Sequence, residues 1–259
     1  MRLFPTTSVI VSALQFPNLL RQVLIGFAHQ TYRKFEIVVV QDGRSDQTRA
    51  VIESFAVNTD FPVRYVTEVR ADDFKTQILN RAVQSAEGNY LIFTDGDCVP
   101  RDDFVMEHLR HATPGRFLSG GCCRLDRNLT KRILEGCVRY QEFTDPSWLN
   151  QAGGRVAKKW IWFQKRTALA KLMDLATTTR PTFNGHNASV WKADLRGVDG
   201  FRHEMRDGGF HRELGERLED MGVLGMQIRH RAVCYHLDHD GVDINDSLWQ
   251  RSRAVPNAA

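Results

Sequence analysis

Residues 35–42 read FEIVVVQD, an almost unbroken apolar run that ends in Gln41 and Asp42. Its β-branched side chains favour extended backbone. A continuous apolar run of this kind is typical of a strand that is buried on both faces of a parallel sheet. We therefore expect a strand at residues 35–40, followed by a turn over residues 42–46.

Similar apolar runs lie before and after this segment, and helical segments alternate with them. Further strands are expected at residues 7–12, 63–66, 89–94 and 116–122, and helices at residues 17–29, 46–56, 74–86 and 101–112. Short strands that alternate with helices of about ten residues are the pattern of βαβ units. The first half of the chain therefore predicts an α/β fold with a parallel sheet.

The alternation ends near residue 124, which divides the chain into residues 1–124 and 125–259. In the second part we expect helices at residues 129–143, 164–176 and 211–222, a loop at residues 183–189 and a strand at residues 232–237. The basic and aromatic run at 158–171 has two interpretations. It is either a segment that contacts an anionic membrane surface or an amphipathic helix that covers this half.

The overall composition is that of a globular protein with a sizeable core. Of its 259 residues, 42% are apolar and 25% are charged, and 35 basic against 31 acidic side chains give a net charge of +4. These values argue against disorder, and the small charge surplus argues against nucleic-acid binding. No apolar run reaches the roughly 18 residues of a membrane span. Since the N-terminal run lacks the features of a signal peptide, a cytoplasmic location is expected.

The five cysteines show neither zinc-finger nor redox-dithiol spacing. Their number is odd and no CxxC motif is present; they are Cys98, Cys122, Cys123, Cys137 and Cys234. Neighbouring residues on a strand point to opposite faces, so Cys122 and Cys123 should diverge. We therefore interpret these two cysteines as small buried hydrophobic residues.

The sharpest chemical feature is Asp95-Gly96-Asp97, directly after the apolar strand at residues 89–94. Ligands of open α/β sheets bind at the carboxyl ends of the strands, and Asp42 ends another strand of the same sheet. Two carboxylates close together suit Mg²⁺ or Mn²⁺ that holds a diphosphate. The alternative is a solvated acidic turn, which the apolar strand makes less favourable.

The first half resembles the family 2 glycosyltransferases of the GT-A fold. The resemblance lies in SVIVSALQFPNLLRQVLIGFAHQTYRKFEIVVVQDGRSDQT and FKTQILNRAVQSAEGNYLIFTDGDCVPRDDFV. The later segments NGHNASVWKADLRGVDGFRHEM, GERLEDMGV and VCYHLDH resemble the C-terminal module of galactosyltransferase-like enzymes. The resemblance implies a Rossmann-like, mostly parallel sheet with a donor-binding half at 1–124 and a smaller acceptor-binding subdomain at 125–259.

The resemblance places the nucleotide-sugar donor against five residues. Asp42 should contact the base or ribose, and Asp95 the ribose and metal. Gln41 stands where the family often has an acidic residue, which leaves base recognition open. Lys75 and Arg81 either approach the diphosphate or are ordinary surface charges.

For the metal, the resemblance implies Asp97 as a direct ligand and His236 as the histidine that completes the site. Imidazole is a competent ligand for Mn²⁺. His239 lies three residues later and would point to the opposite face of a continuous strand. We therefore expect His236 alone to bind the metal, with a structural histidine as the alternative.

The catalytic base departs from the family pattern. The segment Asp207-Gly-Gly-Phe-His-Arg-Glu-Leu214 carries His211 where relatives usually have an acidic residue. Three interpretations stay open: His211 is the base, Asp207 or Glu213 has taken over the role, or the chain is catalytically impaired.

The loop at residues 183–189 resembles the family loop that lines the acceptor and donor-sugar pocket. Gly185 would allow close approach of the backbone, and His186 or Asn187 could hydrogen-bond hydroxyl groups. A plain structural turn is the alternative for each of them.

Together these features imply a metal-dependent, inverting glycosyltransferase. It would move a sugar from a nucleoside diphosphate-sugar, with a UDP-sugar favoured, to a glycan or lipid-linked glycan. The expected acceptor is a cell-surface glycan such as lipopolysaccharide or capsule, and a peripheral position at the inner face of the plasma membrane would suit it. The alternative is a degenerate protein that binds a nucleotide sugar or glycan without transfer.

Overall fold

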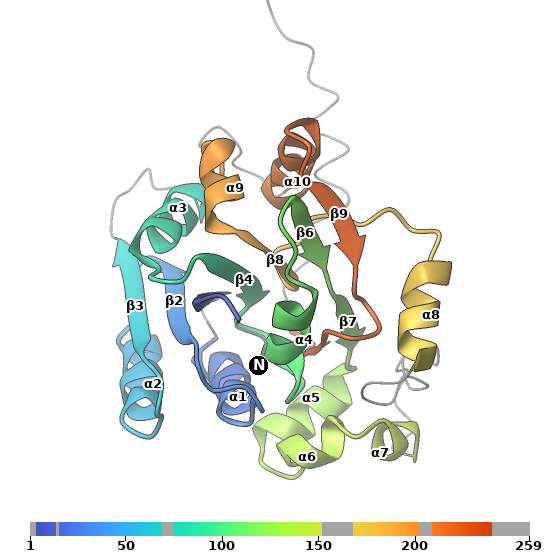
Figure 1. Ribbon diagram of the computed structural model, residues 1–259. Helices are drawn as coiled ribbons and strands as arrows, with labels where there is room; N and C mark the ends of the chain where they lie inside the picture. The colour runs from blue at the N-terminus through green and yellow to red at the C-terminus, as the bar shows by residue number, and fades with distance from the viewer. Residues whose placement is uncertain (1–3, 14–15, 69–74, 152–167, 203–208, 240–259) are drawn as a thin grey trace, which may run out of the picture.

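The chain folds around one large and one small β-sheet (Figure 1). The computed structural model describes residues 4–13, 16–68, 75–151, 168–202 and 209–239. The strands are β1 Thr7–Ser12, β2 Glu36–Asp42, β3 Val63–Glu68, β4 Tyr90–Asp95, β5 Cys98–Pro100, β6 Arg116–Ser119, β7 Gly121–Arg124, β8 Ala188–Trp191, β9 Leu224–Gln227 and β10 Val233–His236. The helices are α1 Pro17–Ala28, α2 Asp46–Ala56, α3 Lys75–Ser85, α4 Phe104–His111, α5 Arg127–Leu134, α6 Tyr140–Phe143, α7 Pro146–Gln151, α8 Ala168–Ala176, α9 Lys192–Gly197 and α10 Phe210–Asp220.

The large sheet has the order β3-β2-β1-β4-β8-β6-β9. Strands β3, β2, β1 and β4 are parallel, while β8 is antiparallel to both of its neighbours. The sequence prediction of an α/β fold with a mostly parallel sheet is thus confirmed. Because β8 and β9 come from the second half of the chain, both halves contribute to this one sheet.

Two apolar cores cover the two faces of the large sheet. Alternate residues of one strand face opposite sides, so Val9 and Val11 join the core beneath α1, α2 and α4, while Ile10 joins the core beneath α3, α9 and α10. Figure 1 shows α1 and α2 on the opposite side from α3, α9 and α10. The near-continuous apolar strands are explained by this burial on both faces.

The small sheet has the strand order β5-β10-β7, and its first strand begins directly after the acidic motif. β5 begins one residue after Asp97, and β10 pairs antiparallel with it and parallel with β7. This short strand β5 was missed in the sequence analysis, as were β8, β9, α7 and α9. Each has at most six residues, too few for a clear hydrophobic period.

The expected strand at residues 116–122 is wrong in one respect, because it divides at Gly120 into β6 and β7, which belong to different sheets. A Cβ atom on residue 120 would lie 1.9 Å from the side-chain oxygen of Asn187. Glycine is therefore required where the chain passes this side chain.

The expected helix at residues 129–143 is also divided. α5 ends at Leu134, and Gly136 has a φ of +75°, which ends the helix before α6 begins at Tyr140. Within the basic and aromatic run, residues 158–167 lie outside the described residues, and α8 covers the rest. None of the helices in the described part of the chain is long and apolar enough to cross a membrane.

Candidate active site

The candidate site lies at the carboxyl ends of β1, β2 and β4. In the order β3-β2-β1-β4 the chain reverses its direction of winding at β1, which is where open α/β sheets bind ligands. The amide of Gly96 donates a hydrogen bond of 2.8 Å to the carbonyl of Ser12 and so joins the acidic motif to the end of β1. A pocket of about 160 Å³ opens beside these ends; it is lined by Ser12, Ala13, Val40, Gln41, Asp42, Lys75, Ile78 and Leu79.

Three of the expected donor-binding residues share this pocket. Asp42 is exposed, whereas Gln41 is buried and accepts a 2.6 Å hydrogen bond from the hydroxyl of Tyr65. Lys75 is the first residue of α3, and its charge acts on Asp95. The pocket thus combines a carboxylate, an anchored amide and a cation.

Arg81 lies apart from the pocket. It is six residues beyond Lys75 on α3, or roughly 9 Å along the helix. It lines a groove with α9 residues, Leu195 and Arg196 among them. The expectation that Arg81 approaches the donor is therefore not supported, because the helix carries it away from the carboxyl edge of the sheet.

The expected metal ligands Asp97 and His236 do meet, and His239 joins them. An Asp97 carboxylate oxygen lies 3.4 Å from Nε2 of His236 and 2.7 Å from Nε2 of His239. Burial acts to raise the pKa of Asp97, but His236, with further hydrogen bonds from Cys98 and His239, lowers it to about 2. Asp97 is therefore ionised at neutral pH.

The expectation that His239 points away is wrong, and the reason is local. β10 ends at His236, so the alternation of a strand no longer applies three residues later. The amide of Leu237 donates a 2.9 Å hydrogen bond to the carbonyl of Asp97, which holds the departing chain against the acidic motif. His239 then packs beside Phe16, with ring centroids 5.3 Å apart.

Asp95 completes the acidic side of the site. Donor atoms of Asp95, Asp97 and Cys98 lie within 4.8 Å of one another, as do those of Asp97, His236 and His239. Burial raises the pKa of Asp95, while the charge of Lys75 opposes this. Carboxylate oxygens with imidazole nitrogens suit Mn²⁺ better than Mg²⁺, which prefers oxygen ligands. The residues present therefore fit a divalent transition-metal ion.

His211 lies directly against the loop that contains Gly185. A Cβ atom on residue 185 would lie 2.1 Å from Nε2 of His211, so only glycine lets the ring approach this closely. The side chain is half-buried, and its Nδ1 atom is buried with no hydrogen-bond partner in the described part of the chain. Burial, with the charges of Lys75 and His186, holds the pKa of His211 well below its usual value. The imidazole is therefore neutral at pH 7.

Of the other two candidate bases, Glu213 is engaged in an ion pair. Both carboxylate oxygens of Glu213 accept hydrogen bonds from Arg217, at 2.6 and 2.9 Å, and Arg202 adds a further contact. Glu213 thus forms an ion pair that ties α10 to the segment after α9, and a role as base is not supported. Asp207 lies outside the described residues.

Asn187 was expected to bind the acceptor, but its side chain has a structural role. Its side chain is fully buried, donates to the carbonyls of Gly121 and Ala232 at 2.8 and 3.0 Å, and accepts from His108 at 2.9 Å. Because its amide is fully engaged, it is not available to a hydroxyl group. His186 is half-buried, its charge acts on Asp95, and its carbonyl accepts a 3.0 Å hydrogen bond from Thr94.

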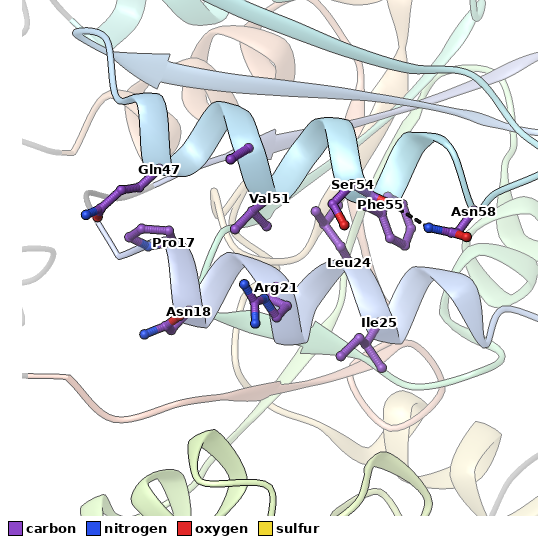
Figure 2. Close-up of a pocket in the computed structure, with 11 residues that line it drawn as sticks. Pro17, Asn18, Arg21, Leu24, Ile25, Gln47, Val51, Ser54, Phe55 and Asn58 are labelled. Carbon is purple, nitrogen blue, oxygen red and sulfur yellow. Dashed lines mark hydrogen bonds between the residues drawn. The ribbon is translucent and has the colours of Figure 1, made fainter.

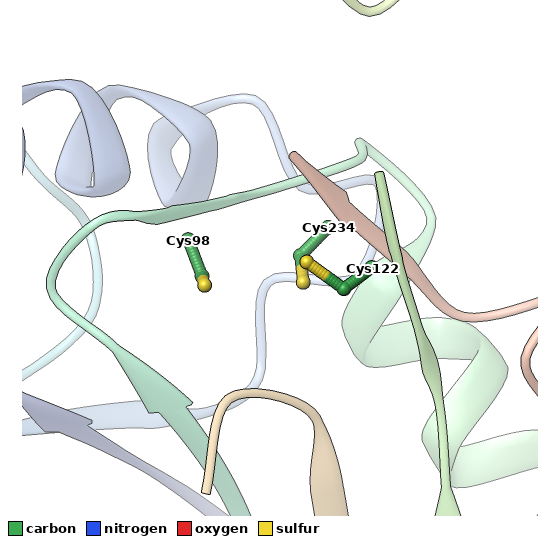
Figure 3. Close-up of side chains that lie close together, drawn as sticks. All are labelled: Cys98, Cys122 and Cys234. Carbon is green, nitrogen blue, oxygen red and sulfur yellow. The ribbon is translucent and has the colours of Figure 1, made fainter. Parts of the chain in front are cut away.

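The sequence analysis missed a cluster of three cysteines. Cys98, Cys122 and Cys234 come from the three strands of the small sheet, and their sulfur atoms lie within 4.8 Å of one another (Figure 3). Cys122 and Cys123 do point to opposite faces, as expected. However, Cys122 is half-buried, so the interpretation as a buried hydrophobic residue holds for Cys123 but not for Cys122, and Cys137 is exposed. No spacing rule could have found the cluster, because its members are brought together only by strand pairing.

A larger cavity, of about 790 Å³, lies away from these residues between α1 and α2 (Figure 2). Its described lining contains a single ionisable side chain, Arg21, between apolar residues such as Leu24 and Phe55. The clustered carboxylates, imidazoles and thiols lie elsewhere, around the acidic motif and the small sheet.

Comparison with known proteins relates the chain to one family. The model of the family "Glycosyl transferase family 2" matches residues 8–160. The uncharacterized glycosyltransferase YfnE of Bacillus subtilis is 31% identical over 104 residues, which are 40% of this chain and 26% of YfnE. A PGL/p-HBAD biosynthesis glycosyltransferase of Mycobacterium bovis is 31% identical over 148 residues, or 50% of this chain and 56% of that protein. The chain thus spans only part of these curated relatives.

Solved structures show the same fold. Mannosyltransferase PcManGT from Pyrobaculum calidifontis, in complex with GDP-Man and Mn²⁺, has a TM-score of 0.63 at 20% identity, over 92% of this chain and 58% of that one. TarS of S. aureus, residues 1–349 with UDP-GlcNAc, has a TM-score of 0.57 at 18% identity, over 91% and 59%. The architecture is therefore of the GT-A type.

Proposed function

Because this chain belongs to glycosyl transferase family 2, we propose that it transfers a sugar from a nucleoside diphosphate-sugar to a hydroxyl group of a glycan. The observation that carries the proposal is the meeting of Asp97, His236 and His239 beside the pocket of Asp42 and Lys75. A site for a divalent cation and a pocket for a nucleotide are the two parts that such a donor needs.

The donor lies, in this proposal, along the carboxyl edge of the large sheet. The exposed carboxylate of Asp42 accepts hydrogen bonds from the base or ribose, while the ammonium of Lys75 faces the diphosphate. Gln41 is held by Tyr65 and presents its amide group to the base. UDP is the nucleotide we favour, and GDP is the leading alternative.

A bound Mn²⁺ would be held by Asp97, His236 and His239, with Asp95 on the open side, and would neutralise charge on the departing diphosphate. Contacts within the chain keep the carboxylate ionised and the ligands in position. Asp97 stays ionised because of its histidine partners, and the 2.9 Å hydrogen bond from Leu237 to its carbonyl keeps the tail of β10 in place. The relative PcManGT was solved with GDP-Man and Mn²⁺, which supports this choice of ion.

For the acceptor side we assign the base to His211. A neutral imidazole accepts a proton from a hydroxyl group, and burial keeps His211 in that form at pH 7. The transfer would be a single inverting displacement, with the acceptor opposite the diphosphate. His186 and Gly185 would line the acceptor pocket.

A second candidate is a protein that binds a nucleotide sugar or glycan without transfer. Two observations favour it: Glu213 is engaged by Arg217, and the burial that keeps His211 neutral also weakens it as a base. This candidate predicts donor binding with neither transfer nor hydrolysis.

The expected acceptor is a cell-surface or lipid-linked glycan such as lipopolysaccharide or capsule, reached from the cytoplasmic face of the membrane. Helix α8 supports this, because it is turned with its apolar side outward. Leu172 and Leu175 are 61% and 76% exposed, while Asp174 is buried and binds Arg231 at 2.6 Å. An outward apolar face with a neighbouring exposed lysine is typical of interfacial helices.

The experiment is a calorimetric titration of UDP, GDP, TDP and CDP, with Mn²⁺ and with a chelator. We expect one diphosphate to bind in the presence of Mn²⁺ and the Asp97→Asn variant to bind it at least about tenfold more weakly. The matched control is Asp60→Asn, an exposed carboxylate far from the site along the chain. Equal binding with chelator, or equal loss in both variants, would contradict the proposal.

A further inference from the structure

The three-cysteine cluster lies on one face of the small sheet. Cys122 and Cys234 are directly opposite each other on the parallel strands β7 and β10, and Cys98 lies diagonally across on β5. Since partners across strands share a face, the three side chains point to the same side. Figure 3 shows Cys234 and Cys122 side by side, with Cys98 facing them from the opposite strand.

We propose that Cys98, Cys122 and Cys234 bind one thiophilic metal ion, of the class of Zn²⁺ or Cu⁺, at a site separate from the Asp97 site. A trigonal ion with metal–sulfur bonds of ~2.3 Å needs sulfur atoms ~4.0 Å apart. The sulfur atoms already lie within 4.8 Å of one another, so the sulfur–sulfur distances need to shorten by less than about 1 Å when the ion binds. Thiolates are the ligands that such soft ions prefer.

The surroundings of the cluster also suit thiolate ligands. The side-chain nitrogen of Asn187 lies 3.8 Å from the sulfur of Cys234, so its partial positive charge faces a thiolate at this position. Cys98 and Cys234 are fully buried, which excludes competing water, while the half-buried Cys122 provides the route by which an ion enters. On binding, the thiol protons pass to solvent and the ion takes their place.

The cluster is linked to the candidate active site through one hydrogen bond. The thiol of Cys98 donates to a carboxylate oxygen of Asp97 at 3.1 Å. When the three cysteines bind a metal ion, Cys98 loses this proton and the Asp97 oxygen is freed. Three thiolates around a divalent ion also carry a net charge of −1 where three neutral thiols stood. Both changes favour a cation at Asp97. If the proposed function holds, the affinity for Mn²⁺ therefore rises about fivefold, and Mn²⁺ strengthens the thiolate site by the same factor.

The test uses the full chain, reduced with a non-thiol reagent, freed of metal and titrated with Cd²⁺. We expect one Cd²⁺ per chain to bind with the ultraviolet charge-transfer absorption of three thiolates. In Cys122→Ser the absorption per ion falls and the affinity drops at least about tenfold. The matched control is Cys137→Ser, since Cys137 is exposed and lies outside the cluster.

Three results would overturn the site: no thiolate absorption, an unchanged titration in Cys122→Ser, or an equal loss in Cys137→Ser. Because serine at this position can destabilise the fold, a second readout is the melting temperature, which Cd²⁺ should raise by less in Cys122→Ser than in the wild type. The Asp97→Asn variant should keep the absorption. A wild-type chain that shows the absorption but binds no diphosphate would reject the proposed function alone, and an unchanged Mn²⁺ affinity would reject the link between the sites.

Discussion

His211 and Glu213 lie two residues apart on α10, and their different surroundings determine what each can do. Both carboxylate oxygens of Glu213 accept hydrogen bonds from Arg217, which also donates to the carbonyl of Gly200 at 2.7 Å. His211 instead packs its ring against Phe201 and Phe210 beside the loop of Gly185. A carboxylate in an ion pair stabilises the fold, whereas a neutral imidazole is able to accept a proton.

The first prediction concerns turnover. Replacing His211 with glutamine keeps a polar side chain but removes the proton acceptor, so kcat should fall roughly 100-fold or more while the Kd of the donor changes less than about twofold. Glu213→Gln is the control, and it should lower the melting temperature rather than kcat. Sugar transfer measured with a radiolabelled donor checks both, and full turnover in His211→Gln would assign the base elsewhere.

The second prediction concerns His108, which is fully buried and hydrogen-bonds Asn187 and Ser189 at 2.9 and 2.7 Å. Burial lowers its pKa to about 3. The folded state keeps this histidine neutral while the unfolded state protonates it near pH 6.5, so stability falls as the pH drops below 6.5. Between pH 7 and pH 5 the loss from this residue is about 2 kcal/mol.

Urea unfolding at the two pH values tests this dependence in the wild type and in His108→Gln. The variant should lose about 2 kcal/mol less than the wild type over the same interval, although it starts less stable. His29→Gln is the control, because that histidine is exposed. Identical pH dependence in wild type and His108→Gln would show that the imidazole is not held neutral.

At the scale of single elements, α8 departs from the usual amphipathic arrangement. Asp174 faces inward, where it accepts a hydrogen bond from the amide of His230 at 2.9 Å and pairs with Arg231. The apolar Leu172 and Leu175 are exposed in consequence. An outward apolar face next to the exposed Lys171 is typical of interfacial helices, as the proposed membrane contact requires.

The third prediction follows from this helix. Changing Leu172 and Leu175 to serine should weaken binding to vesicles that contain phosphatidylglycerol about tenfold, because the apolar contact with the lipid is lost. Val57→Ser is the control, since Val57 is 85% exposed just beyond α2. Co-sedimentation with anionic and with neutral vesicles measures the effect. Equal binding of the double variant and the control would exclude α8 as the contact.

Most elements of the first half could be predicted, because their strands are apolar runs that alternate with helical segments. The strand ending in Asp42 and the helices at 17–28 and 46–56 agree with the sequence analysis to within about two residues. The division at Gly120 could not be predicted, since it depends on the side chain of Asn187, 67 residues away in the sequence. His239 was misjudged for a similar reason, because a strand of four residues ends before its alternation can be extended.

At the scale of the whole molecule, the two halves of the sequence do not form separate sheets. β8 lies between β4 and β6, and β10 lies between β5 and β7. Short strands paired with distant ones carry little local signal, which is why the sequence predicted their residues only in part. The same interleaving assembles the candidate metal ligands, since Asp97 precedes β5 while His236 ends β10.

This interleaving leads to the last prediction, that residues 1–124 do not fold alone. Without the second half, β5 and β7 lose β10, and β6 loses both β8 and β9. These strands would then expose unpaired backbone groups and apolar side chains, which costs more than a domain of marginal stability can supply. Circular dichroism should show no cooperative unfolding of the fragment, and adding residues 125–259 should restore it. A cooperative transition of 1–124 by itself would show that the first half carries a complete core.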